Sequence, residues 1–240
     1  FFKTRKYRKL LGSIGQQRAF GELFGWFFSK LLFDNYTLDF DSTVMVREGN
    51  QEGTAKGYNP KRPGRPSHHP LLAFVSDVRM IASYWLRPGN TVANTNCLAF
   101  LEDTLSRLEN KTVGLVRMDS GFFTKEILDF LEYKNLRYII ACRFNNRIKY
   151  SLTHEHAWVE VANGLEISET TYQANGWDQP RHIIMVRQEI QKRPNAAGKQ
   201  AGNWNFSRTG TISANTVTAV SSPISGCRSK SYTINIAEER

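Results

Sequence analysis

The sequence lacks a long apolar run and an initiator methionine. Its most apolar early stretch, Leu23 to Phe33, is interrupted by Ser29 and Lys30. It falls short of the roughly 18 apolar residues that a bilayer span needs, so we expect no membrane partner. The chain begins at Phe1 and continues with basic residues instead of a secretory signal. We therefore expect a fragment whose true beginning is missing.

Cysteine and histidine are also scarce. The cysteines are far apart and show no CxxC spacing, at Cys97, Cys142 and Cys227. They favour a reducing cytoplasm over a disulfide framework. The histidines form only two close groups, His68–His69 and His154-x-His156, neither with cysteines at zinc-site spacing. We expect solvated loop histidines and no zinc.

Acidic residues are outnumbered by basic ones. The 240 residues include 32 Lys and Arg against 22 Asp and Glu, a formal net charge of +10. Because neutralising phosphates releases condensed counterions, this excess favours nucleic acid as the partner. Charge alone does not decide the matter, since many basic proteins bind no nucleic acid. Hydrophobic residues make up 40% of the chain, which is enough to build a core.

Strand-like and helix-like segments alternate in the middle of the chain. Period-two alternation, β-branched residues and helical spacing of leucines identify them. The expected elements are a strand at 36–41, a hairpin from 71–76 and 81–86, a helix at 94–108, a strand at 113–119, a helix at 124–133 and a strand at 137–142. This order is the layout of an RNase H-like α/β domain, a mixed sheet flanked by helices.

The remaining segments set the domain boundaries. Residues 47–70 are rich in Gly, Pro, Lys and Arg, which predicts a long basic loop. Strand-like pieces at 158–161, 165–170 and 182–189 predict a β-rich insertion, and the last segment is rich in Ser and Thr. We divide the chain into a helical lead-in at 1–34, an RNase H-like core at 35–145, the insertion at 146–206 and a poorly ordered tail at 207–240.

Two of the expected strands end in a carboxylate, Asp41 and Asp119. An Asp at a strand end is more often a solvated or turn-capping residue. Phosphodiester cleavage, however, requires divalent metal held by carboxylates that are distant in sequence and adjacent in space. Gly121 would let the chain turn sharply behind Asp119 and leave its carboxylate exposed. Asp41 and Asp119 are therefore candidate catalytic residues and ligands for Mg²⁺ or Mn²⁺.

Several short motifs follow one another in a specific order. They are Leu38-Asp-Phe-Asp-Ser-Thr-Val44, Gly49-Asn-Gln-Glu-Gly53, Gly57-Tyr-Asn-Pro60, Gly64-Arg65, Ser67-His-His-Pro-Leu-Leu72, Leu86-Arg-Pro-Gly-Asn90 and Arg117-Met-Asp-Ser-Gly-Phe122. In this order they resemble the bacterial insertion-sequence transposases of DDE domain group 1. The resemblance implies an RNase H-like catalytic domain interrupted by a β-rich insertion, and Mg²⁺-dependent nicking of transposon ends followed by their joining to target DNA.

The same resemblance implies residues and partners. It places the first family Asp on Asp41, with Asp39 less favoured, and the second on Asp119. It implies double-stranded DNA as partner, a homo-oligomeric DNA complex, and a cytoplasmic, nucleoid-associated place in a bacterium.

The family's third acid is missing from the sequence. Family members carry it on a helix of the form Tyr-Arg-Gly-Arg-Ala-(Asp/Glu)-x-Glu-Asn, which does not occur here. The ending Asn235 to Arg240 can be back-translated so that a shifted frame reads Tyr-Arg-Gly-Arg-Ala. We therefore hypothesise a frameshift near residue 207 and expect little or no transposition. Glu238 and Glu239 are disfavoured as replacements, because nothing before them resembles a helix.

Basic residues near these acids have two interpretations. Lys56, Lys61, Arg62 and Arg65 either keep a mobile loop soluble or clamp the DNA backbone, and we favour the clamp, with Tyr58, His68 and His69 able to touch sugar or base. Arg117 lies two residues before Asp119 and could contact phosphate or pair with a carboxylate. Besides transposase, two readings stay open: a catalytically silent DNA-binding fragment and an RNase H-like nuclease.

Overall fold

The computed structural model describes residues 22–23, 25–31, 34–49, 51–59, 62–108, 111–154, 157–189 and 212–220, the last as backbone only. Of the expected lead-in, residues 25–29 are helical and Phe28 is buried, whereas residues 1–21 lie outside the described part. Among the helices that are described, none is long and apolar enough to cross a membrane.

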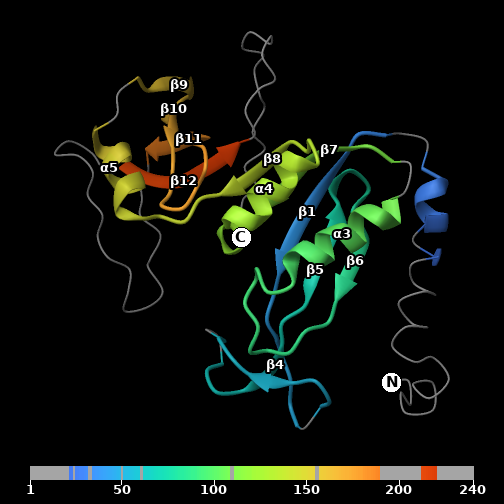
Figure 1. Ribbon diagram of the computed structural model, residues 1–240. Coiled ribbons are helices and arrows are strands. Elements are labelled where there is room, and N and C mark those ends of the chain that lie inside the picture. Colours follow the sequence, from blue (N-terminus) through green and yellow to red (C-terminus); the bar gives the residue numbers. More distant parts are fainter. Residues whose placement is uncertain are drawn as a thin grey trace.

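A nine-stranded mixed sheet runs through the molecule in the order β6-β5-β1-β7-β8-β12-β11-β10-β9 (Figure 1). Its first five strands are β1 (Tyr36–Ser42), β5 (Leu71–Val75), β6 (Met80–Trp85), β7 (Val113–Met118) and β8 (Tyr138–Ala141). β1, β7 and β8 are parallel, and β5 and β6 form a hairpin antiparallel to β1. The expected mixed α/β sheet and its element order are confirmed.

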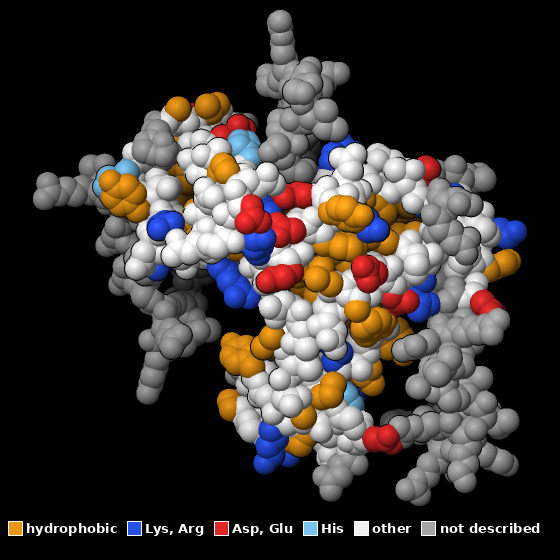
Figure 2. All heavy atoms as spheres, viewed as in Figure 1, with side chains coloured by type: hydrophobic (Ala, Val, Ile, Leu, Met, Phe, Trp, Pro, Cys, Tyr) orange, Lys and Arg blue, Asp and Glu red, His pale blue; other side chains and the backbone are white. Residues whose placement is uncertain are grey.

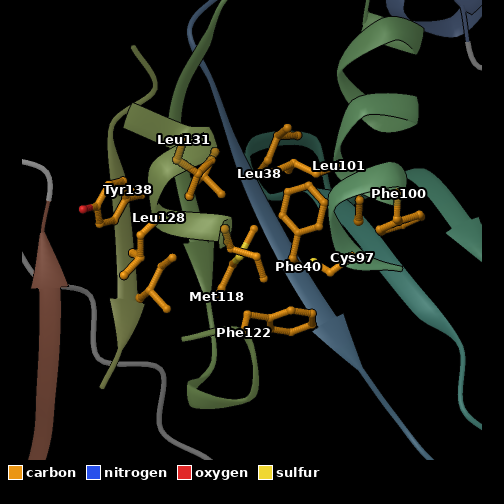
Figure 3. Close-up of a cluster of buried hydrophobic side chains, with 14 of the residues drawn as sticks. Leu38, Phe40, Cys97, Phe100, Leu101, Met118, Phe122, Leu128, Leu131 and Tyr138 are labelled. Carbon is orange, nitrogen blue, oxygen red and sulfur yellow. The ribbon is translucent and has the colours of Figure 1, made fainter. Parts of the chain in front are cut away.

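Two helices, α3 (Cys97–Leu108) and α4 (Lys125–Tyr133), cover one face of these five strands (Figure 1). Phe40 from β1 meets Phe100 of α3 edge to face, with ring centroids 5.8 Å apart, and Met118 of β7 lies in the same cluster (Figure 3). Since successive side chains of a strand point to opposite faces, the residues next to Phe40 and Met118 point away from the helices.

The segment expected as a long basic loop instead contains a small antiparallel sheet. Its strands are β2 (Met45–Val46), β3 (Ala55–Lys56) and β4 (Pro66–His68), in the order β2-β4-β3. Gly57 and Gly89 allow two turns to pack closely, because a Cβ on Gly57 would lie 1.9 Å from the carbonyl oxygen of Gly89. The loop prediction was wrong because the Gly- and Pro-rich composition of residues 47–70 reveals neither these short strands nor their contact with Gly89.

The insertion contains α5 (Asn146–His154), β9 (Val159–Ala162), β10 (Leu165–Tyr172) and β11 (Arg181–Glu189), and α5 was not predicted. β12 (Ile212–Val220) comes from the segment expected as a tail. It pairs antiparallel with both β11 and β8, so the insertion continues the core sheet. The rest of that tail, residues 207–211 and 221–240, lies outside the described residues, as does the hypothetical frameshifted ending.

Candidate active site

Asp41 and Asp119 occupy equivalent positions at the carboxyl edge of two neighbouring strands. The parallel register of β1 and β7 pairs Phe40 with Met118, so continuing it by one residue brings Asp41 beside Asp119. Neighbouring strands are about 5 Å apart. Both aspartates are exposed, whereas Phe40 and Met118 are buried, which places the two carboxylates on the same face, away from α3 and α4.

Local structure holds the Asp119 carboxylate. Asp119 precedes the 3-10 helix η2 (Ser120–Phe122), and its Oδ1 accepts a hydrogen bond of 2.8 Å from the Gly121 N–H. A Cβ on Gly121 would lie 2.8 Å from Ala93 Cβ and 2.9 Å from Asp119 Oδ1. Gly121 is not among the residues with positive φ. Its role is therefore to leave space beside the carboxylate, and the sharp turn that the sequence predicted is not what requires glycine here.

Asp41 is held in a similar way, and the buried side chain of Arg87 braces the chain behind it. Asp41 Oδ1 accepts a 2.7 Å hydrogen bond from the Ser42 N–H. Arg87 donates through Nη2 to Ser42 Oγ at 3.2 Å. It also donates to the backbone carbonyls of His69, Val92, Ala93 and Thr95. Burial lowers the pKa of Arg87.

Arg87 thereby ties the end of β1 to the loop whose Ala93 packs against Gly121. Ser42, which follows Asp41, and the Ala93 loop beside Gly121 are thus both bound by the Arg87 guanidinium. Sequence reasoning missed this role, and its only signal was the Arg87-Pro-Gly-Asn90 motif.

The Asp39 carboxylate forms a two-point ion pair with Arg117. Both bonds, Nε to Oδ1 and Nη2 to Oδ2, are 2.6 Å long, and Nη2 also donates to Ser76 Oγ at 3.0 Å. The hydrogen bond with Asp39 raises the pKa of Arg117. Of the two interpretations of Arg117, pairing with a carboxylate is the one the structure contains. Because Asp39 is engaged in this pair, Asp41 remains the better candidate for the first acid.

The predicted DNA clamp maps onto the small sheet. Lys56 ends β3, Arg62 and Arg65 precede β4, and all three are exposed, while Lys61 lies outside the described residues. Arg62 is 3.6 Å from Glu48 in an ion pair between two exposed side chains, an arrangement that contributes little to stability. Figure 2 shows Lys and Arg side chains at the lower end of the molecule, where Figure 1 places β4 below the carboxyl end of β1.

The neighbouring histidines differ from expectation. His68 lies in β4 and is buried, with Nδ1 accepting from Arg47 Nε at 3.2 Å and Nε2 lying 3.2 Å from the Glu52 carbonyl. Burial and the Arg47 charge lower the pKa of His68, so this ring is neutral at pH 7. It is therefore neither solvated nor able to touch DNA. Half-buried His69 places Nδ1 2.6 Å from the Thr91 carbonyl.

Sequence reasoning also missed Arg143, which follows β8 at the same edge. Its exposed guanidinium donates to the Ser120 carbonyl at 2.9 Å and to the Gly121 carbonyl at 3.1 Å. The same Gly121 donates its N–H to Asp119. A fixed positive charge therefore lies one peptide group away from the second acid.

A hard divalent cation fits this donor set in part. Asp41 and Asp119 supply carboxylate oxygens, which Mg²⁺ prefers. One oxygen of each bonds to a backbone N–H and leaves Oδ2 for a metal. Within the described residues, no group of three or more His, Cys, Asp or Glu could hold a metal. The site therefore contains two acids and no third protein ligand from this part of the chain.

Comparison with known proteins gives the family. A sequence model described as Transposase DDE domain group 1 matches residues 27–196. No curated protein matches the chain. Among solved structures, a cryo-EM structure of the piggyBac transposase synaptic complex with hairpin DNA is similar at 12% identity and a TM-score of 0.48. The similarity covers 94% of this chain and 41% of that one, and neither fold nor function follows from so distant a likeness. The matched segment contains β1, β7 and both aspartates, and the chain belongs to the Transposase DDE domain group 1 family.

Proposed function

We propose that the chain is the catalytic core of a DDE transposase from a bacterial insertion sequence. In this proposal the parent enzyme cleaves the transposon ends and joins them to target DNA, with Asp41 and Asp119 as metal ligands. One observation supports it above the others: two acids 78 positions apart in the sequence each follow a member of the paired residues Phe40 and Met118 on adjacent parallel strands, and both are exposed.

The assigned cofactor is Mg²⁺ or Mn²⁺. Such an ion supplies activation of a water or sugar hydroxyl and stabilisation of the leaving oxygen. The residues of this chain hold and orient the ligands: the Ser42 and Gly121 N–H groups fix the Asp41 and Asp119 carboxylates. Two like charges side by side disfavour each other, which favours binding of a cation between them.

Double-stranded DNA is the proposed partner, bound as transposon end and as target. Lys56, Arg62 and Arg65 are exposed on one side of the acid pair, and exposed cations suit a polyanion. We assign them to the phosphate backbone together with Lys61, which neighbours Arg62 in the sequence. Arg117 was also predicted to bind DNA. Since Asp39 and Ser76 engage its Nε and Nη2, only its Nη1 is left for a phosphate.

We infer that this chain itself cleaves DNA weakly or not at all. At the candidate site the described residues supply two acids, Asp41 and Asp119, whereas the resemblance implies a site with three. We propose that a frameshift near residue 207 replaced the helix that carries the third acid. Sequencing the coding DNA tests this: the idea fails if no shifted frame encodes Tyr-Arg-Gly-Arg-Ala. We further propose a homo-oligomeric DNA complex in the bacterial cytoplasm, at the nucleoid.

Nicking of a transposon-end duplex tests the catalytic assignment. The duplex is incubated with the full chain in Mg²⁺, in Mn²⁺ or in EDTA, beside Asp119→Asn and Asp41→Asn variants. Expected is binding with at most trace nicking, and loss of any nicking in either variant or in EDTA. Metal-dependent nicking that persists in both variants would show that these aspartates are not the catalytic acids.

A catalytically silent DNA-binding fragment is the alternative function. The absence of a third acid within the described residues favours it. Binding without any nicking, even at high Mn²⁺, would support this reading. An RNase H-like nuclease is disfavoured by the Gly57-Tyr-Asn-Pro60 and Arg87-Pro-Gly-Asn90 motifs, and cleavage of an RNA–DNA hybrid in preference to duplex DNA would revive it.

A further inference from the structure

The guanidinium of Arg87 binds two segments that lie beside the candidate acids. Arg87 follows β6 and is 5% exposed. Its side chain donates to the hydroxyl of Ser42 and to four backbone carbonyls, one at His69 and three in residues 92–95. The planar fork of a guanidinium presents several donors in a fixed geometry, which a lysine ammonium does not. Arg87 therefore fixes these segments relative to one another.

The bond to Ser42 connects Arg87 with the first acid. Ser42 Oγ accepts from Arg87 Nη2 at 3.2 Å, and the Ser42 N–H donates to Asp41 Oδ1 at 2.7 Å. Ser42 thus binds the guanidinium with its side chain and the Asp41 carboxylate with its backbone. A displacement of Ser42 would therefore reorient the carboxylate of Asp41.

The bonds to residues 92–95 connect Arg87 with the second acid. A Cβ on Gly121 would lie 2.8 Å from Ala93 Cβ, so Ala93 closes the space beside Gly121. The Gly121 N–H in turn donates to Asp119 Oδ1 at 2.8 Å. The position of residues 92–95 therefore limits where Gly121 and the Asp119 carboxylate can lie.

Positioning by Arg87 and the charge of Arg87 have opposite effects on a cation bound between the acids. Groups that orient metal ligands through hydrogen bonds typically change metal affinity by about 10–100-fold when they are removed. A positive charge near the site, by contrast, repels a cation. Removing the guanidinium therefore weakens metal binding if Arg87 positions the acids, and strengthens it if Arg87 acts through its charge alone.

We propose that Arg87 is a positioning residue that sets the spacing of the Asp41 and Asp119 carboxylates for a divalent cation. It does so by holding Ser42 and residues 92–95 at the same time. The inference deepens the proposed function and rests on it, because it assigns control of metal affinity to a buried residue outside the acid pair. The two connections can be broken separately, at Ser42 and at Gly121.

Binding of Mn²⁺ to the full chain tests the inference without DNA or cleavage. The loss of the electron paramagnetic resonance signal of free Mn²⁺ measures the Kd. Ser42→Ala removes the acceptor of Arg87 Nη2 and keeps the backbone N–H that holds Asp41. Its Kd for Mn²⁺ is expected to rise roughly tenfold or more. Ser42→Thr retains a hydroxyl and should restore most of the affinity.

Ser83→Ala is the matched control. The Ser83 hydroxyl also makes a side-chain hydrogen bond of 3.2 Å, to Asp103 Oδ2 of α3, and Ser83 is 2% exposed. Ser83→Ala therefore removes a comparable hydrogen bond that does not involve the acid pair. It is expected to lower the melting temperature at least as much as Ser42→Ala and to leave the Kd for Mn²⁺ unchanged. Thermal melting in EDTA checks that every variant is folded during the titration.

Arg87→Met separates positioning from charge. It is expected to weaken Mn²⁺ binding at least as much as Ser42→Ala does, although the loss of a positive charge by itself would strengthen it. Tighter binding of Mn²⁺ by Arg87→Met would overturn the inference. If Arg87→Met does not fold, the Ser42 variants decide.

Gly121→Ala tests the connection to the second acid. The added methyl group would meet Ala93 Cβ and Asp119 Oδ1, so Mn²⁺ binding is expected to weaken. Ala93→Gly in the same chain removes one of these two contacts and should restore part of the affinity. No restoration would show that residues 92–95 do not control the second acid, which contradicts the inference.

The outcomes separate the two proposals. If the wild type binds Mn²⁺ and Asp119→Asn does not, while Ser42→Ala binds as tightly as Ser83→Ala, the positioning inference is overturned and the proposed function stands. If the wild type binds no Mn²⁺, or Asp119→Asn binds it equally well, both fall. If Ser42→Thr binds as weakly as Ser42→Ala, packing at position 42 and not the bond to Arg87 is responsible, which also overturns the inference.

Discussion

At the residue scale, the two carboxylates proposed to bind metal are expected to lower the stability of the metal-free chain. Asp41 and Asp119 carry like charges on adjacent strands, with Arg117 turned toward Asp39 instead. Two such charges repel each other in the folded state, and a cation that binds between them stabilises that state. A neutral residue at either position should therefore stabilise the metal-free chain.

The variant Asp119→Asn tests this conflict. Without metal, its melting temperature is expected to rise by about 1–3 °C, because the repulsion is removed and an Asn oxygen can still accept from Gly121 N–H. For a Kd of about 1 mM, 10 mM Mg²⁺ stabilises the wild type by about 1.4 kcal/mol. The variant should lose that gain.

Glu102→Gln is the control, since Glu102 is an exposed acid on α3, away from the pair. Differential scanning calorimetry in EDTA and in Mg²⁺ measures both effects. Equal Mg²⁺ stabilisation of wild type and Asp119→Asn would contradict the metal assignment.

Residues differ in how far the sequence predicts them. The positions of Asp41 and Asp119 at the carboxyl ends of two strands were predictable, because the pattern of each strand is local; their catalytic role stays a prediction. Arg87 and Arg143 were not, because their roles depend on backbone carbonyls of other segments, from His69 to Thr95 and at Ser120 and Gly121. His68 was misplaced for the same reason, since its burial results from the packing of the small sheet.

At the scale of elements, one buried side chain joins the insertion to the core. Arg181, 4% exposed at the start of β11, pairs with Glu132 of α4 at 2.7 Å and with Asp129. Its Cζ lies 4.4 Å from the Trp177 ring centroid. Tyr138 donates a 2.7 Å hydrogen bond to the same Glu132. This cluster fixes α4, β8 and β11 relative to one another.

The cluster makes the free energy of unfolding depend on pH in the acidic range. Burial acts to raise the pKa of Glu132, but hydrogen bonds from Arg181 and Tyr138 outweigh it, and the net pKa is lowered. A carboxyl whose pKa is lower in the folded state contributes stability that is complete above its unfolded pKa, near 4.3. That contribution is lost as the pH falls through the folded pKa.

Glu132→Gln is therefore expected to lower the free energy of unfolding at pH 7 by about 2 kcal/mol and to flatten its dependence on pH below about 5. Urea unfolding between pH 7 and pH 3 measures both. Glu126→Gln, on the exposed side of the same helix, should leave both nearly unchanged. If the unfolding free energy of Glu132→Gln fell with pH as steeply as that of the wild type, this role of Glu132 would be contradicted.

Long elements were predictable and short or composite ones were not. α3 and α4 show leucine spacing over several turns, and β5 is a continuous apolar run of five residues. α5 has only Ile148 and Leu152 on its buried side, too few to stand out. The three-stranded sheet has strands of two or three residues, which are too short to show a pattern, and it packs against a distant segment at Gly89.

At the scale of the whole molecule, β12 makes one sheet out of two parts. The sequence predicted a core and a separate β-rich insertion, and each set of strands was found locally. Their union was not predictable, because β12 lies more than 70 positions after β8 yet pairs Thr218 with Ala141 on one side and Val217 with Met185 on the other.

Because β12 lies between β8 and β11, disrupting it tests whether it connects the insertion strands to the core strands. Proline has no N–H to donate and is not tolerated in the middle of a sheet, so Val217→Pro should break the ladder between β8 and β11. The core keeps its own buried cluster around Phe40, Leu101 and Leu128. Val217→Pro is therefore expected to loosen the insertion selectively.

Hydrogen exchange with mass spectrometry distinguishes the two parts. Amides of β10 and β11 should exchange at least tenfold faster in Val217→Pro, corresponding to about 1.4 kcal/mol of lost protection, while those of β1 and β7 keep their protection. Val217→Ala retains the backbone N–H and should change exchange much less. Equal loss of protection in β1 would show that the nine strands unfold as one unit. Unchanged exchange in β11 would contradict its pairing with β12.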